Sequence, residues 1–138
     1  MVLIDSSIWI EAARRDGDLK AKLGLKSLLG ELEAVLCAPV RLEVLGGARK
    51  MERERLEHDF SFVPFLQVLD KDWLAAVENS WKLRDAGLTI PWNDILIASL
   101  ALRGKMRVYA KDKHFESMAP MLGFKLYEPG YGGMFQPE

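Results

Sequence analysis

The stretch Val2-Leu3-Ile4-Asp5-Ser6-Ser7 lies at the start of the chain and decides its fold. Three apolar residues in a row are typical of a short strand that is buried on both faces. An acid followed by two serines is a common start of a helix, and Ile8, Trp9, Ala12 and Ala13 then recur at helical spacing. A buried strand that leads directly into a helix is the repeating unit of folds with a parallel sheet.

The same alternation continues along the chain. Short apolar runs at 35–37, 107–110 and 126–127 predict further strands, whereas Pro64 argues against a central strand at 63–69. Helical patterns occupy 19–32, 39–46, 49–59, 71–83, 94–102 and 114–122. We therefore predict an α/β fold with a short, mainly parallel central sheet flanked by helices.

Four acidic residues adjoin these predicted elements: Asp5, Glu43, Asp94 and Asp112. Asp5 and Asp112 follow strands, and Asp94 opens a nearly continuous apolar helix. Parallel crossovers bring the carboxyl ends of strands to one edge of a sheet, where such folds bind ligands. Gathered carboxylates repel one another unless a cation lies among them, and oxygen ligands suit a hard divalent ion. The pattern therefore predicts a metal-dependent enzyme that cleaves phosphodiesters.

Each acid also has an ordinary explanation. Asp5 and Asp94 could cap helices, although Asn93 could itself cap the second one. Glu43 could be a solvated helix residue, and Asp112 could pair with a neighbouring lysine at the surface. The residues alone leave both interpretations open.

Composition narrows the class of protein. The 138 residues fit one domain, 1–138, in which we expect 129–138 to be an irregular tail, and 49% hydrophobic residues exclude a disordered chain. A net charge of -1 gives no global basic field for nucleic acid. The single cysteine, Cys37, excludes an internal disulfide and a cysteine zinc site, and its apolar neighbours predict a core position. Without a signal or membrane-spanning pattern, we expect a cytoplasmic protein.

Four motifs occur in the order of a known family. They are VLIDSSIWIEAA (2–13), RLEVLGG (41–47), PWNDILIASLAL (91–102) and VYAKDKHFE (108–116). Together they resemble the motifs of PIN-domain ribonucleases, most nearly the VapC-type toxins of toxin–antitoxin pairs. The resemblance spans nearly the whole chain and implies a single PIN-like domain.

The resemblance also implies a site. It makes Asp5, Glu43, Asp94 and Asp112 the catalytic, metal-binding set for one or two Mg²⁺ or Mn²⁺ ions, with Ser6 supporting them. Such a site would hydrolyse RNA with water activated by the metal, and Glu43 would be a ligand or would orient that water. One departure is Ala110, where many members carry a hydroxyl residue.

Partners follow from the same resemblance: an RNA substrate, a cognate antitoxin and a second copy of the chain. Trp9, Trp73, Trp81 and Trp92 could serve an interface, but we expect most of them in the core. Solvent exposure is the simpler explanation for the basic residues beside the acids, Arg41, Lys111 and Lys113. We expect His114 to be a structural or surface histidine.

Three alternatives compete with a ribonuclease. Receiver domains need two adjacent early acids, and phosphatases with an aspartate nucleophile need a second aspartate two residues on. Ser6 and Ser7 occupy those places. A degenerate PIN-like module that binds RNA or protein without cleavage is the third, and Ala110 is a mild point in its favour.

Overall fold

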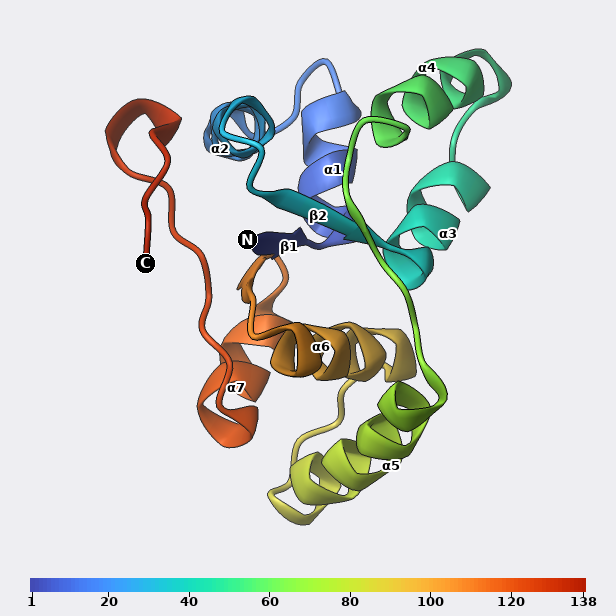
Figure 1. Cartoon of the computed structure of the whole chain (residues 1–138), viewed down its shortest axis with the longest axis vertical. Coiled ribbons are helices and arrows are strands. Elements are labelled where there is room, and N and C mark those ends of the chain that lie inside the picture. Colours follow the sequence, from blue (N-terminus) through green and yellow to red (C-terminus); the bar gives the residue numbers. More distant parts are fainter.

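The computed structural model describes residues 1–138, with a parallel four-stranded sheet between groups of helices (Figure 1). The strands lie side by side in the order β3-β2-β1-β4. Their bounds are β1 (Val2–Ile4), β2 (Ala34–Cys37), β3 (Phe65–Leu66) and β4 (Arg107–Tyr109). The predicted α/β class with a parallel central sheet is confirmed.

Seven α-helices surround the sheet: α1 (Ser6–Ala13), α2 (Leu19–Gly30), α3 (Ala38–Gly46), α4 (Lys50–Phe60), α5 (Asp70–Asp85), α6 (Trp92–Gly104) and α7 (Lys113–Leu122). In Figure 1, α1 and α2 lie on one side of β1 and β2, and α6 and α7 lie on the other. Helix α5 packs against α6, outside the sheet. Because both faces of the sheet are covered, the central strands β1 and β2 are continuous apolar runs rather than alternating ones.

The opening strand β1 is the centre of the fold. Its three residues are fully buried and belong to a core of 28 buried residues. Leu3 pairs with Val35 of β2 and with Val108 of β4. At the end of β1, the backbone N–H of Asp5 donates to the carbonyl of Tyr109 (2.9 Å). This pairing brings the segments that follow β1 and β4 together at one edge.

Two strand predictions need comment. Pro64 precedes a strand of only two residues, β3, which lies at the edge of the sheet, so the doubt about a central strand was justified. The predicted strand at 126–127 is wrong, because only one bridge forms, between Val108 and Leu126. Pro129 follows closely and has no N–H with which to extend the pairing.

The tail after residue 128 is more ordered than predicted. It contains one 3₁₀ turn, Tyr131–Gly133, which packs against α2. Gly133 has φ +85°, and a Cβ there would stand 2.5 Å from the Cβ of Leu23. Only glycine fits this close approach. Apart from this turn, residues 129–138 have no regular structure.

The prediction that most tryptophans are buried is wrong. Trp9 lies in the core, but Trp73, Trp81 and Trp92 are each more than half exposed. Cys37 is fully buried, as predicted. None of the helices combines the length and the apolar character needed to cross a bilayer.

Candidate active site

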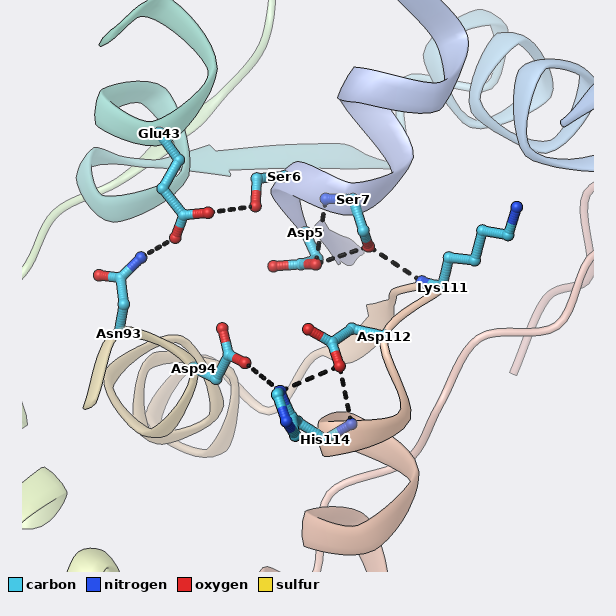
Figure 2. Close-up of polar contacts among 9 residues, drawn as sticks. All are labelled: Asp5, Ser6, Ser7, Glu43, Asn93, Asp94, Lys111, Asp112 and His114. Carbon is cyan, nitrogen blue, oxygen red and sulfur yellow. Dashed lines mark hydrogen bonds and ion pairs between the residues drawn. The ribbon is translucent and has the colours of Figure 1, made fainter. Parts of the chain in front are cut away.

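The four predicted acids face a common space at the carboxyl edge of the sheet (Figure 2). Asp5 follows β1, Glu43 lies on α3 after β2, Asp94 lies in the first turn of α6, and Asp112 follows β4. Their negative charges act on one another. The charge of Glu43 contributes to a raised pKa of Asp5, and the charges of Asp5 and Asp112 contribute to a raised pKa of Asp94. Topology thus brings together residues that are far apart in the sequence.

Asp5 caps a helix with one carboxylate oxygen and leaves its other oxygen without a partner. It caps α1, because its Oδ2 accepts hydrogen bonds from the backbone N–H (3.1 Å) and the hydroxyl (2.6 Å) of Ser7. Its Oδ1 has no hydrogen-bond partner although the residue is only 2% exposed, and Figure 2 shows this oxygen turned toward the other acids. Burial raises the pKa of Asp5, with a contribution from Glu43, against the lowering effect of the Ser7 hydrogen bonds. A buried oxygen without a partner requires an explanation, and a bound cation supplies one.

Glu43 is exposed but fixed. Its Oε2 accepts a hydrogen bond from the hydroxyl of Ser6 (2.7 Å), and its Oε1 accepts one from the side-chain amide of Asn93. Ser6 belongs to α1 and Asn93 to α6, so three helices meet at this carboxylate. Simple solvation therefore does not describe Glu43, because both oxygens are held in place.

Asp94 is the most strongly perturbed acid of the site. It is 8% exposed, and the residue before α6 is Pro91, without a side-chain cap. Capping by Asp94 or by Asn93 is therefore wrong as an explanation. Burial, together with the charges of Asp5 and Asp112, raises the pKa of Asp94 to about 6, although a hydrogen bond with His114 opposes this. Strong perturbation by burial and like charges is typical of functional carboxylates.

Asp112 and His114 lie next to Asp94 and complete the site. Asp112 caps α7 by accepting the backbone N–H of His114 (2.9 Å). The Nδ1 of the His114 ring lies 3.0 Å from Oδ1 of Asp112 and 3.0 Å from Oδ2 of Asp94. These three side chains offer ligand atoms that all lie within 4.8 Å of one another. The expectation that His114 is a structural or surface histidine did not include its contacts with Asp94 and Asp112.

The lysines beside Asp112 do not neutralise it. Lys111 turns away and lies 3.6 Å from Glu11 and 3.7 Å from Asp18. The ion pair of Asp112 is with His114 rather than with either neighbouring lysine, so the alternative explanation of Asp112 as a surface lysine pair does not hold. The backbone N–H of Lys111 instead donates to the Ser7 hydroxyl (3.0 Å), which itself donates to Asp5. Ser7 thereby links the strand end after β4 to the one after β1, beside Ala110.

Three supporting residues were not predicted as part of the site: Ser7, Asn93 and His114. Each stands within two residues of a predicted acid, and this closeness was the only signal in the sequence. The assembled site presents one buried carboxylate oxygen without a partner, a fixed glutamate and an imidazole nitrogen beside two carboxylates. Such a set can hold a divalent cation and leave a carboxylate free to act on water.

Known proteins share this architecture. The PIN domain family model matches residues 2–120. VapC ribonuclease Mb1587 of Mycobacterium bovis is 36% identical over 124 residues, which cover 86% of this chain and 92% of that protein, and Ribonuclease VapC11 of Mycobacterium tuberculosis gives the same values. The solved structure of VapBC2 from Rickettsia felis, bound to a DNA fragment from the promoter, has a TM-score of 0.75 at 20% identity and covers 92% of this chain and 98% of that one. The chain belongs to the PIN-domain family, as its four motifs predicted.

Proposed function

We propose that this chain is a metal-dependent endoribonuclease, the toxin of a toxin–antitoxin pair, which hydrolyses RNA phosphodiester bonds. The observation that carries the proposal is the unpartnered, buried Oδ1 of Asp5 among three further carboxylates. Relatives at 36% identity are named ribonucleases, which supports the same activity here.

The residues fit one or two Mg²⁺ or Mn²⁺ ions. Asp5, Asp94 and Asp112 would hold them, because oxygen ligands suit both cations. A bound cation would supply Lewis-acid stabilisation of the charge that builds on the phosphate oxygens. It would also compensate the burial and the repulsion by Asp5 and Asp112 that together raise the pKa of Asp94.

Glu43 has a separate part in the proposed reaction. Unlike Asp94 it is exposed, and Ser6 and Asn93 hold its two oxygens in a fixed direction. A fixed carboxylate beside the phosphate would orient the attacking water and accept its proton, as general bases do. Glu43 can also approach a cation, so we assign it both the catalytic and the metal-binding role.

The test is cleavage of a panel of structured RNAs, including transfer RNAs and ribosomal RNA fragments. Wild type, Asp5→Asn and Asp94→Asn are each compared with Mg²⁺, Mn²⁺ or EDTA. The proposal requires metal-dependent cutting that both substitutions abolish. Binding of RNA without any metal-dependent cut would instead favour the degenerate binding module.

An apolar groove between α1, α2 and α4 supports the antitoxin part of the proposal. It has a volume of about 820 Å³, and its lining includes Trp9, Leu25, Leu29, Leu56 and Phe62. Four basic residues, Arg14, Arg15, Lys22 and Arg55, also line it and outnumber the two acidic ones, Glu52 and Asp59. An amphipathic antitoxin helix with an apolar face and acidic flanks would fit such a surface. Leu29→Glu should weaken antitoxin binding in a pull-down and leave RNA cleavage unchanged, and undiminished binding would rule this groove out.

The exposed face of α5 supports a homodimer. Trp73, Val77 and Trp81 stand on one stripe of that helix and are all exposed, and large exposed apolar patches commonly mark interfaces. Light scattering should give twice the mass of one chain, and Trp81→Glu should reduce it to a monomer.

We also propose that 1–138 form one domain that acts in the cytoplasm, where RNA is available.

A further inference from the structure

The imidazole of His114 lies where a ligand of the cation would lie. Its Nδ1 is equally distant, at 3.0 Å, from a carboxylate oxygen of Asp94 and one of Asp112. Figure 2 shows the ring between these two acids, on the side of the site opposite Glu43. None of the sequence motifs assigned the histidine a role.

We propose that His114 binds the catalytic cation directly through Nδ1, so that the site is a mixed nitrogen and oxygen site rather than an all-carboxylate one. This inference rests on the proposed function, because it concerns the same cation. It extends that function by predicting which metals the protein prefers.

The distances suit coordination. Adjacent ligands of an octahedral ion, each about 2.1 Å from the metal, stand about 3.0 Å from one another. Both separations of Nδ1 from the carboxylate oxygens have this value. A single ion could therefore contact all three atoms with little movement of their side chains.

The backbone holds the ring in this position. The N–H of His114 is fixed by the Asp112 side chain at the start of α7. The next residue, Phe115, is fully buried and anchors that helix in the core. The unpartnered Oδ1 of Asp5 provides a further ligand atom for the cation on the other side of the site. The histidine is thus held in advance, which lowers the entropy cost of binding.

An imidazole ligand changes the choice of metal. Neutral imidazole suits transition ions, whereas Mg²⁺ prefers oxygen ligands and keeps several waters. The hydrogen bond between Nδ1 and Asp94 requires a proton between the two atoms, which a bound cation would displace; with the ring proton on Nε2, the Nδ1 lone pair is then free to bind the ion. We therefore expect the site to favour Mn²⁺ over Mg²⁺ and to lose this preference when the imidazole is removed.

The first experiment measures pulsed electron spin resonance of Mn²⁺ bound to the full chain. Modulation from a directly bound nitrogen should appear in wild type and vanish in His114→Ala. The chain has only one other histidine, His58, which lies on α4 and packs against Phe62. His58→Ala is therefore the matched control and should keep the nitrogen signal.

A second measurement gives the metal preference. In binding titrations, His114→Ala should lower Mn²⁺ affinity by about tenfold or more and change Mg²⁺ affinity much less. Mn²⁺ that binds wild type without a nitrogen signal would overturn the inference and leave the proposed ribonuclease intact. Failure of wild type to bind either ion would overturn both. Circular dichroism of His114→Ala checks that the variant is folded, and the wild-type nitrogen signal does not depend on it.

Discussion

Asp72 and Asp94 occupy the same place in two helices that pack against each other, yet their environments are opposite. Each is the third residue of its helix and is buried, at 1% and 8% exposure. Asp72 accepts hydrogen bonds from Arg103 (2.7 Å) and from the backbone N–H of Leu69 (2.7 Å). Asp94 faces further acids and shares a histidine with one of them.

The pKa values record this difference. Burial alone would raise the pKa of Asp72, but the hydrogen bonds from Arg103 and Leu69 hold it below its ordinary value. Burial and neighbouring carboxylates raise the pKa of Asp94 to about 6. A buried acid with a partner stabilises the fold, whereas a buried acid among acids is ready for a cation. We propose on this ground that Asp72 is a structural carboxylate and Asp94 a functional one.

The largest expected effect is the loss of cleavage in Asp94→Asn. Losing a cation ligand removes several kcal/mol of transition-state stabilisation, which corresponds to a rate loss of about a thousandfold. Initial rates of RNA cleavage at saturating Mn²⁺ measure it. Asp72→Asn is the matched control and should cut at the wild-type rate per folded molecule. Equal losses in both variants would erase the distinction between the two acids.

The next effect is the destabilisation of the fold by Asp72→Asn. This change leaves Arg103 without its charged partner, and breaking such a pair costs about 2 kcal/mol for a partly exposed arginine. Urea unfolding in EDTA measures the free energy of unfolding. Under these conditions Asp94→Asn should be as stable as wild type or more stable, because it removes repulsion. A destabilised Asp94→Asn protein would contradict the proposed repulsion.

A third expectation concerns the response to metal. An ion that binds only the folded chain, at ten times its dissociation constant, adds about 1.4 kcal/mol and raises the melting temperature by about 3–5 °C. Wild type and Asp72→Asn should both show this increase at neutral pH. Asp94→Asn should show less. A wild-type melting temperature indifferent to millimolar metal would count against the site.

The smallest effect is on pH dependence in EDTA. Asp94 holds its proton more tightly in the folded chain, with a pKa of about 6 against an ordinary 3.8. Its stabilising contribution is therefore full below pH 3.8 and disappears as the pH rises through about 6, a loss of about 1 kcal/mol after solvent screening. For Asp72 the sign is reversed, since stability is lost as the pH falls through its lowered pKa. The melting temperature of wild type should fall as the pH rises from 4 to 7, and the melting temperature of Asp94→Asn should change less over the same range.

The sequence predicted the parts of the site that depend on the order of elements. The apolar run before Asp5 and the apolar helix after Asp94 indicate where strands and helices end, and parallel topology then brings the acids together. It did not predict contacts between side chains of different elements. The amide of Asn93 on Glu43 and the ring of His114 between two acids depend on helix orientation, which no local pattern encodes.

The prediction that most tryptophans are buried failed for a related reason. Trp73, Val77 and Trp81 recur at helical spacing, and this pattern ordinarily predicts a buried face. Helix α5 instead packs against α6 through another face, where Asn79 donates to Ser99 (2.9 Å) and Leu83 is buried. Periodicity identifies an apolar stripe but does not say whether the same chain or another one covers it.

The two-residue strand after Pro64 has a consequence for solubility at high concentration. An open sheet edge is a template on which another chain can add a strand, and this is a common route to aggregation. Here Pro64 offers no N–H and β3 ends after Leu66, so this edge of the sheet has few free backbone groups with which a strand of another chain could pair. At the opposite edge, Val108 of β4 is already paired with Leu126 from the chain's own tail. The protein can therefore accumulate as folded chains with little risk of growing into fibres through its sheet.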